Sequence, residues 1–477
     1  MTPSARPPAS LWLALTPLAL LVGLLALNVA IFGDAGIEGP NQFALILAGA
    51  AAATIGLTRG VSWHQLQEGM LSVVHVAITP VLMLLLIGAL SSAWTVSGIV
   101  PTLIYYGLQL ADPAWFYAAT AVVCAIISSA VGSSWTTAAT IGVAMMATGE
   151  GLGLDPAITA GAVISGGYFG DKLSPLSDTT NLAAGVCNVD LFSHVRYMAF
   201  TTLPSFAIAL LIFLFLGWQH SNASEISQSA QMLTALQNSI FLSGWLLLVP
   251  ALIVTLIMLR LPALPVMLIA TLLGALCAAL FQTELIYQIG GSTDWKGLYK
   301  GLIQSIVSST EIQTGHAAST DLLSRGGMAG MLNTIWLILS AVVFGGLMEA
   351  SGLLGRITDA LKNLARSRTS LVATTAGSCG VLNLTTAEQY LTLLIGGRMY
   401  KDLYDQHNLS PRNLSRTLED CGTVTSVLVP WNTCGAYHAV VLNIATLSYL
   451  PYCFFNLISP LMSILYMRFN IKIEEKA

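Results

Sequence analysis

Apolar residues gather along the chain into runs of about 20 residues, separated by short polar stretches. A helix of about 20 apolar residues spans the hydrocarbon core of a bilayer. The pattern therefore predicts a bundle of membrane-spanning helices rather than the amphipathic elements of a soluble fold. The clearest runs are 11–32, 42–57, 70–96, 197–217, 240–259, 262–281, 328–349 and 445–467.

The first run, 11–32, follows Arg6 and in this respect resembles a secretory signal peptide. It is longer than the apolar part of a signal peptide, which has about 7–15 residues, and it lacks a cleavage site of small residues. We therefore interpret it as the first spanning helix.

Composition supports the membrane assignment. Only 9% of the 477 residues are charged and 55% are hydrophobic, whereas about 25% of the residues of a soluble domain are charged. No basic patch is interleaved with aromatic residues, which argues against nucleic acid as a partner. The seven cysteines form no CxxC pair and are expected to be small buried hydrophobes.

Lysine and arginine are concentrated in a few loops. None occurs in 60–171 or 197–259, whereas 355–370 and 398–417 hold four each. Loops rich in these residues stay in the cytoplasm. We therefore expect 355–370, 398–417 and both termini to be cytoplasmic, and 218–239 to be periplasmic, in the inner membrane of a bacterium.

The segment 371–397 lies between the two basic loops and must return to the side from which it starts. Its residues, about 27, are too few to cross a bilayer twice, and 377–383 interrupts the apolar pattern. We therefore predict a re-entrant helical hairpin that turns at 377–383. The alternative is one long kinked helix, which would need a basic loop outside.

Three short motifs recur in the same order in the two halves, which predicts an internal repeat. The pairs are W-x-x-L-x-E-G-M at 63–70 with W-x-x-L-x-K-G-L at 295–302, Thr136–Ala138 with Thr385–Ala387, and Pro175 with Pro430. The offsets between the motifs drift, mainly through a polar insertion at 303–327.

If the two halves are repeats, 114–148 in the first half should form a hairpin that corresponds to the one at 371–397. This hairpin should enter from outside, because its flanks carry acids and no lysine or arginine. Five spans and one hairpin in each half would invert the second half. We expect an all-α polytopic membrane protein of two inverted-topology repeats, with discontinuous helices at its centre. The expected boundaries are 1–217 for the first repeat, 218–239 for a periplasmic linker, 240–468 for the second repeat and 469–477 for a cytoplasmic tail, with broken helices at 156–190 and 418–443.

The motif around Pro175 places two carboxylates, a lysine and several hydroxyls inside an apolar region. Proline interrupts a helix, and irregular backbone at membrane depth is tolerated where it is buried in protein or lines a water-filled cavity. Oxygen ligands there suit Na⁺, and a carboxylate can take a proton when Na⁺ leaves. The alternative is a surface loop with an Asp171–Lys172 ion pair and Ser177 or Asp178 as an N-cap.

Asp178 is the first candidate for a carboxylate shared by Na⁺ and H⁺, with Asp171 second. The Na⁺ ligands are expected to be Asp178, Ser177 and Thr179, which lie together at the break. The further residues expected at the ion or substrate site are Asn181 of the first break, Ser133, Ser134, Thr136 and Thr137 of the first hairpin, and Asn383, Thr385, Thr386, Glu388, Asn432 and Thr433 of the second half.

The second break, 419–435, differs from the first. Asn432 and Thr433 match the positions of Ser177 and Asp178, so no acid lies at the break itself. This places the ion-binding charge in the first half. Glu388, near the second hairpin, is a functional candidate because acids inside membranes are costly, and its alternative is a position near the cytoplasmic interface.

Several motifs resemble the NhaC family of sodium/proton antiporters. They are G-D-K-L-S-P-L-S-D-T-T-N-L-A at 170–183, T-A-E-Q-Y-L at 386–391, G-R-M at 397–399 and P-W-N-T-C-G at 430–435. The resemblance covers roughly 60–465. It implies membership of the ion transporter superfamily, whose members pair re-entrant hairpins with broken helices.

The resemblance implies exchange of Na⁺ for H⁺ by alternating access, and not an enzyme. The alternative is transport of a small organic acid or amino acid, because similar families include malate/lactate and amino-acid exchangers. The sequence has no ATP-binding motif of the type G-x-x-x-x-G-K-[ST], so energy should come from an ion gradient. No cofactor is expected; the expected partners are Na⁺, H⁺ and the lipid bilayer, and a homodimer is left open.

Overall fold

The computed structural model describes residues 9–32, 36, 38–110, 112–219, 226–259, 261–313, 320, 323–324 and 326–476. Over these residues the chain is almost entirely helical, and its one β contact is an isolated bridge between Leu409 and Glu475. This confirms the all-α class. Arg6 and most of the polar part of the predicted insertion, including His316, Asp321 and Arg325, lie outside the described residues.

The first half of the chain forms one series of helices. Its elements are α1 (Leu11–Phe32), α2 (Pro40–Thr58), α3 (Trp63–Val96), α4 (Ile99–Leu110), α5 (Pro113–Val131), α6 (Ser134–Thr137), the π-helix η2 (Ala138–Gly142), α7 (Val143–Gly151), α8 (Pro156–Leu173), α9 (Asp178–Val186) and α10 (Leu191–Gln219).

The second half is more finely divided. Its elements are α11 (Ile226–Ser239), η3 (Gly244–Leu247), α12 (Leu248–Met258), α13 (Ala263–Phe281), α14 (Thr283–Gly290), α15 (Trp295–Val307), η4 (Ala329–Met331), α17 (Leu332–Ala350), α18 (Leu353–Lys362), α19 (Arg368–Thr385), α20 (Gln389–Gln406), α21 (Pro411–Leu418), the π-helix η5 (Glu419–Thr423), η6 (Ser426–Leu428), α22 (Thr433–Val441), α23 (Thr446–Tyr449), η7 (Leu450–Tyr452) and α24 (Phe454–Arg468).

Seven of the described helices are long and apolar enough to cross a bilayer, and two bent helix pairs raise this number to nine. All eight apolar runs of the sequence coincide with such a helix or pair. The run 240–259 falls on a pair bent by 94°, and the run 445–467 on a pair bent by 55°. Many large apolar side chains are exposed, among them Trp12, Leu211 and Trp218, as expected for a surface that contacts lipid.

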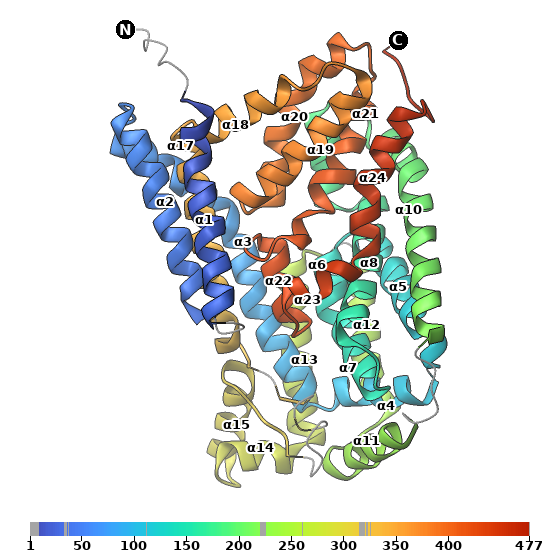
Figure 1. Cartoon of the computed structure of the whole chain (residues 1–477). Helices are drawn as coiled ribbons and strands as arrows, with labels where there is room; N and C mark the ends of the chain where they lie inside the picture. The colour runs from blue at the N-terminus through green and yellow to red at the C-terminus, as the bar shows by residue number, and fades with distance from the viewer. Residues whose placement is uncertain are drawn as a thin grey trace.

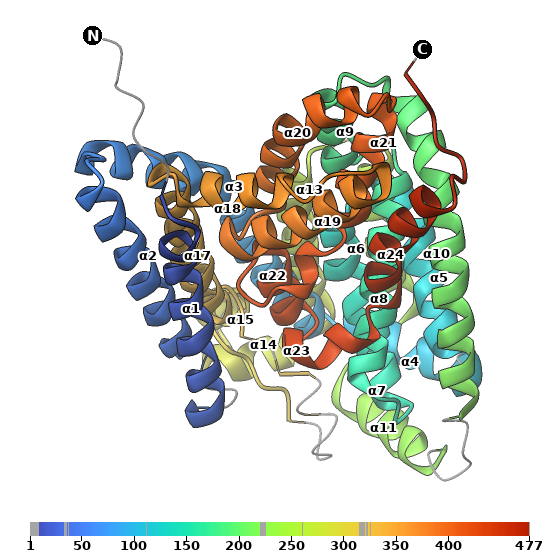
Figure 2. The same ribbon diagram turned by 45° about the horizontal axis from the view of Figure 1, so that its top comes forward.

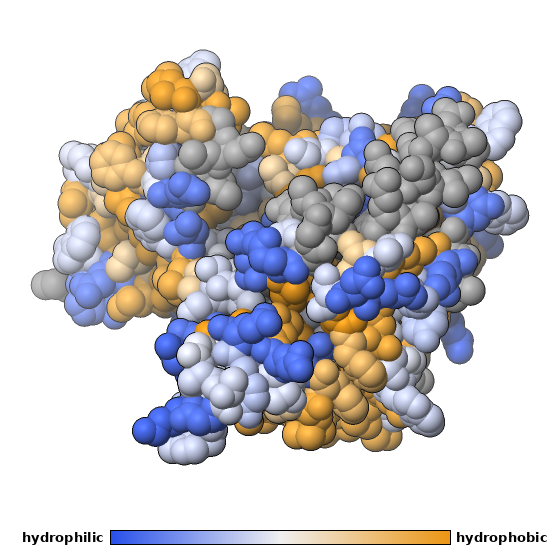
Figure 3. All heavy atoms as spheres, turned by 90° about the horizontal axis from the view of Figure 1, so that it is seen from below, coloured by the Kyte–Doolittle hydropathy of each residue, from blue (hydrophilic) through white to orange (hydrophobic). Residues whose placement is uncertain are grey.

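The helices are arranged with distinct ends (Figure 1). The upper end carries α18, α20, α21 and the C-terminal residues, and the lower end carries α11, α14 and α15. In Figure 2, α1, α2 and α17 lie on the left and α5, α8 and α10 lie on the right. Helices α19, α20, α22 and α23 lie between these two groups. Seen from below, hydrophilic residues are interspersed with hydrophobic ones over the lower end (Figure 3).

Close packing of α8 on α5 positions the first break. A Cβ atom on Gly166 would come within 2.1 Å of the carbonyl oxygen of Ala121, and one on Gly170 within 2.3 Å of that of Ala125. No side chain fits in this space, so glycine alone allows the approach. The residue after Gly170 is Asp171, which is therefore held at a fixed distance from α5.

Two sequence expectations are wrong in detail. Helix α19 continues through 377–383 and ends at Thr385, and the chain turns at Ala387, which has a φ of 55°. Glycines in a helix do not break it when every backbone group is bonded within the helix. The two Thr-Thr-Ala motifs also occupy different positions. Thr136 lies in α6, after the turn that ends α5, whereas Thr385 is the last residue of α19, before the turn at Ala387.

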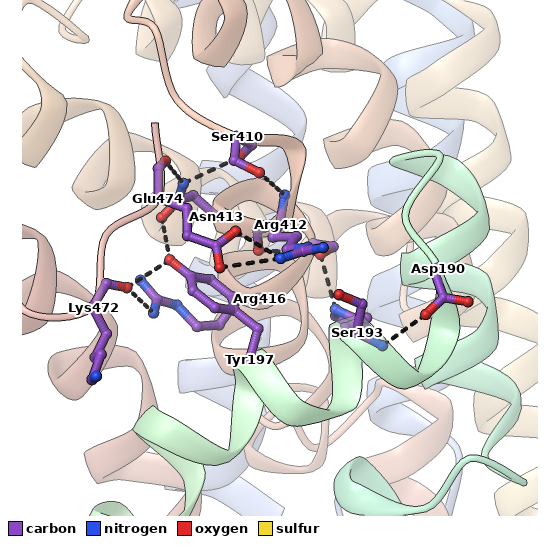
Figure 4. A network of polar contacts seen from close by, with 11 residues as sticks. Asp190, Ser193, Tyr197, Ser410, Arg412, Asn413, Arg416, Lys472 and Glu474 are labelled. Atoms are coloured by element: carbon purple, nitrogen blue, oxygen red, sulfur yellow. Dashed lines mark hydrogen bonds and ion pairs between the residues drawn. The ribbon is translucent and has the colours of Figure 1, made fainter. Parts of the chain in front are cut away.

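The C-terminal tail, 469–476, lies against the upper end of α10 and α21 (Figure 4). Asn413 donates to the carbonyl oxygen of Glu474 (2.7 Å) and accepts from the hydroxyl of Tyr197 (2.7 Å). Arg412 forms an ion pair with the carboxylate of Glu474 at 3.0 Å. The Arg416 guanidinium packs over the ring of Tyr197, 4.5 Å from its centroid. The tail therefore joins elements from both halves of the chain.

Candidate functional site

The first break separates α8 from α9. Pro175 and Leu176 lie between Ser174, the C-cap of α8, and Ser177, the N-cap of α9, whose side chain accepts from the backbone N–H of Thr180. Ser177 is thus an N-cap, as the alternative interpretation of this motif proposed. The interruption itself lies where Pro175 predicted it.

Local side chains already bond several backbone carbonyls of this break. Asn181 donates to the carbonyl oxygens of Pro175 (3.0 Å) and Ser177 (2.7 Å), and Thr180 donates to that of Lys172 (3.1 Å). These carbonyls have one of their two lone pairs engaged. Side-chain oxygens are therefore the more available ligands for an ion.

The carboxylates of the first break occupy different environments. Asp178 is exposed, whereas Asp171 is 7% exposed. Ser177 and Thr179 are buried, with their hydroxyls 3.1 Å apart, and Asn181 is exposed. The residue that the sequence ranks first therefore has an exposed side chain, and the second is enclosed.

Asp171 connects α8 to the tip of the first hairpin segment. Its Oδ2 accepts from the backbone N–H of Ser134 (3.0 Å) and from the Ser134 hydroxyl (2.7 Å). Its Oδ1 is buried and has no hydrogen-bond partner. A buried carboxylate oxygen without a partner is rare and costly. Asp171 can therefore accept one further donor or a cation.

The other hydroxyls of the first hairpin segment bond within their own turn. Ser133 is the N-cap of α6 and accepts from the backbone N–H of Thr136 at 3.2 Å. Thr137 donates to the carbonyl oxygen of Ser133 at 2.9 Å. Of this predicted group, Ser134 alone is seen to bond Asp171, while Ser133, Thr136 and Thr137 shape the turn.

Lys172 pairs with Asp420 and not with its neighbour Asp171, so the Asp171–Lys172 pair of the alternative interpretation does not form. Both side chains of the Lys172–Asp420 pair are fully buried. Asp420 also accepts from Thr201 (3.3 Å), from Ser459 (3.3 Å) and from Ser463. The pair joins α8 to the π-helix η5 and so connects the two halves of the chain.

The second break meets the turn after α19. Glu388 is buried and caps α20, and one of its carboxylate oxygens accepts from Thr433 at 3.3 Å. Asn432 donates to the carbonyl oxygen of Asn383 (3.1 Å), and the backbone N–H of Thr433 to that of Ala387 (2.9 Å). Glu388 is thus enclosed by protein.

The remaining predicted residues of the second half have structural partners. Asn383 donates to the carbonyl oxygen of Gly422 at 2.7 Å and accepts from Thr392 at 2.9 Å. Thr385 donates to a carbonyl oxygen of its own helix, and Thr386 to those of Leu382 and Glu388. These bonds fix the turn rather than leave ligands free.

The first and second breaks lie close together. The hydroxyl of Tyr437 in α22 donates to the carbonyl oxygen of Trp135 in α6 (2.7 Å), and the two rings stack at 4.0 Å. In α8, which leads to the first break, the ring of Tyr168 lies 5.6 Å from that of His438 in α22. The site is therefore built by both halves of the chain.

Two acids at the start of the second break were not selected from the sequence. Glu419 and Asp420 are buried in the π-helix η5. Their adjacency just before the apolar segment 427–429 was the available signal, because acids in an apolar region need partners. Over the described residues, no group of three or more His, Cys, Asp or Glu side chains is arranged to hold a metal ion. All seven cysteines are free, and six are buried.

Comparison with known proteins places this arrangement among ion transporters. Residues 166–471 match the Na⁺/H⁺ antiporter family. The chain is 41% identical to the Na(+)/H(+) antiporter NhaC of Alkalihalophilus pseudofirmus, over 87% of each chain. It is 36% identical to NhaC of Bacillus subtilis, over 89% of this chain and 91% of the relative. It is 35% identical to the malate-2H(+)/Na(+)-lactate antiporter of the same species, over 93% of this chain and 91% of the relative.

Proposed function

Because the chain belongs to the Na⁺/H⁺ antiporter family, we propose that it exchanges Na⁺ for H⁺ across the bacterial inner membrane. The observation that carries the proposal is Asp171, an enclosed carboxylate with one unpartnered oxygen at the meeting point of two interrupted helices. Such a group binds either a cation or a proton, but not both together. Exchange follows if the site faces each side of the membrane in turn.

Each residue at the first break has a proposed role in binding Na⁺. The backbone N–H and hydroxyl of Ser134 hold Oδ2 of Asp171, so Oδ1 points to one occupant. Exposed Asp178, at the start of α9, would draw cations towards the break. The Ser177 and Thr179 hydroxyls, 3.1 Å apart, are the neutral oxygen ligands nearest to Asp178 in the chain. Na⁺ would pass between these oxygens and those of Asp171.

We further propose two inverted-topology repeats with the boundaries expected from the sequence. Helices α4 and α7 lie together at the lower end, whereas α18, α20 and α21 lie at the upper end, which supports hairpins that enter from opposite sides. Pro175 and Pro430 each precede an N-cap by two residues, Ser177 and Asn432 respectively. The basic residues of α18 to α21 at the upper end support a cytoplasmic upper end.

A second candidate function is exchange of a small organic acid. The malate/lactate relative motivates it, and so do the interrupted helices α9 and α22, whose N-termini favour negative charge. Against it, Ser177 and Asn432 already cap these N-termini. Uptake of labelled malate, lactate or arginine into liposomes driven by a Na⁺ gradient would favour this second function.

The test uses purified protein in liposomes that contain a pH indicator. An inward Na⁺ gradient should drive proton export from wild-type liposomes. Asp171→Asn should abolish the exchange, because the amide keeps the shape but has no negative charge to attract Na⁺ and does not take up a proton. Asp178→Asn, the matched control, should reduce the rate only in part. If Asp178→Asn alone abolishes exchange, the shared carboxylate is Asp178; if neither variant changes it, the proposed site is wrong.

A further inference from the structure

Glu419 has no structural role that explains its burial. It is the first residue of the π-helix η5, its side chain is fully buried, and neither of its carboxylate oxygens has a hydrogen-bond partner. A buried carboxylate normally accepts several hydrogen bonds or pairs with a cation. Asp420, the next residue, does both, with Lys172 and three hydroxyl groups.

Two more unpartnered oxygens lie near Glu419. Thr423, four residues later in the same π-helix, faces the Glu419 carboxylate, and neither group forms a hydrogen bond of normal length and angle. Asp171 lies in the same region, because its neighbour Lys172 pairs with Asp420, the neighbour of Glu419, and its Oδ1 also has no hydrogen-bond partner. Oxygens of three side chains from α8 and η5 therefore lack donors in one buried region. Hard oxygen ligands without donors are what a small cation requires.

The side chains of this region can carry more negative than positive charge, which favours the binding of a cation. Asp171, Glu419 and Asp420 can carry three negative charges, and Lys172 supplies one positive charge, which Asp420 engages. His194 packs near Lys172 and Asp420. From the other elements around η5, the groups that face it are Cys379 of α19, Tyr404 of α20 and Arg416 of α21. Arg416 packs on Tyr197 instead of Glu419.

The π-helix η5 carries both acids. Such turns often occur at functional sites. Helix α21 and η5 are enclosed on all sides, since every residue from Asn413 to Thr423 is buried, and Glu419 and Asp420 therefore both lie inside the protein.

We propose that Glu419 is a second cation-binding carboxylate, which holds Na⁺ together with Oδ1 of Asp171 and the hydroxyl of Thr423. The inference rests on the proposed Na⁺/H⁺ exchange and adds a ligand from the second half of the chain. When Na⁺ leaves, a proton on one carboxylate can be shared with the other. The site then spans both halves, so their relative movement would open or close it.

The test measures Na⁺ binding and proton release on purified full-length protein in detergent. NaCl is added at constant ionic strength against choline chloride, binding heat is recorded, and a pH indicator follows released protons. Glu419→Gln should lower the apparent Na⁺ affinity roughly ten-fold to a hundred-fold and reduce the protons released per Na⁺ bound. Glu284→Gln, an exposed acid at the lower end, is the control and should behave as wild type.

Two further variants separate binding from folding. Thr423→Val keeps the shape but removes one oxygen, so it should weaken Na⁺ binding and leave proton release per bound Na⁺ unchanged. Glu419→Asp keeps the charge, so it should retain proton release at lower affinity, even if Glu419→Gln fails to fold. Wild-type affinity and proton release in Glu419→Gln and Thr423→Val would overturn the proposal while the exchange function stands. Absence of Na⁺ binding in the wild type would overturn both.

Discussion

Lys172 and Asp420 form an ion pair with both side chains fully buried, although 248 residues separate them in the chain. Lys172 lies at the end of α8 and Asp420 in η5. Breaking a buried pair from one side leaves an uncompensated charge, which costs far more than the pair itself contributes.

This asymmetry gives a prediction. Lys172→Met should lower the free energy of unfolding by roughly 3–5 kcal/mol, measured as a fall in the thermal unfolding midpoint in detergent. The double variant Lys172→Met/Asp420→Leu should recover much of that loss, because no charge remains buried. A single variant as stable as wild type would mean that solvent or another cation reaches Asp420.

The membrane orientation can be tested with single cysteines in a cysteine-free variant. Thr293, between α14 and α15, and Gln406, the last residue of α20, are both exposed. Helices α14 and α15 lie at the lower end and α20 at the upper end (Figure 1). An impermeant thiol reagent should label Thr293→Cys in intact cells, and should label Gln406→Cys only after the cells are made permeable. Labelling of Gln406→Cys from outside would exclude the cytoplasmic upper end.

Pro175 and Pro430 mark the two breaks, and each is followed two residues later by an N-cap. Pro175→Ala and Pro430→Ala should lower the rate of Na⁺/H⁺ exchange more than they lower stability, since alanine allows the helices to extend through the breaks and displaces the side chains that the breaks position. Exchange in liposomes and thermal unfolding would be compared. An equal loss of both would show that these prolines serve folding alone.

The tail offers a comparison of a buried amide with an exposed charge. Asn413 is buried and bonds Ser410, Glu474 and Tyr197, so Asn413→Ala should cost about 1–3 kcal/mol of stability through unsatisfied groups. The Arg412–Glu474 pair is about 40% exposed on both sides, so Glu474→Gln should cost about 0–1 kcal/mol. Thermal unfolding of both variants checks the order, and the reverse order would mean that charge dominates.

The spanning helices were predictable because lipid requires long apolar runs whatever packs behind them. The position of the second turn was not. Gly377 and Gly380 suggested a break, but helix α19 passes through them and the chain turns at Ala387, a residue that does not usually adopt positive φ. Tertiary bonds to Thr433 and Asn432 fix this turn, and such contacts are not visible in local sequence.

The sequence indicated which residue types would bind an ion, but it did not show which of these residues are buried. The motif around Pro175 located the first break and both of its acids. Burial separated them, because Asp178 is exposed and Asp171 is enclosed by α5 and α6. Glu419 was not selected because it lies at the start of the second break, far from Pro430, and its burial depends on the elements that pack around η5. The Lys172–Asp420 pair depends on packing between distant elements and could not be read from spacing.

The tail also bears on the order in which the protein is assembled. Residues 469–476 leave the ribosome after every helix from α1 to α24, yet they bond α10, which was made more than 250 residues earlier. Until they arrive, Tyr197 and Asn413 lack the backbone oxygens that they bond in the finished protein. A chain truncated after Arg468 would therefore contain every helix from α1 to α24 but leave the upper ends of α10 and α21 without the tail.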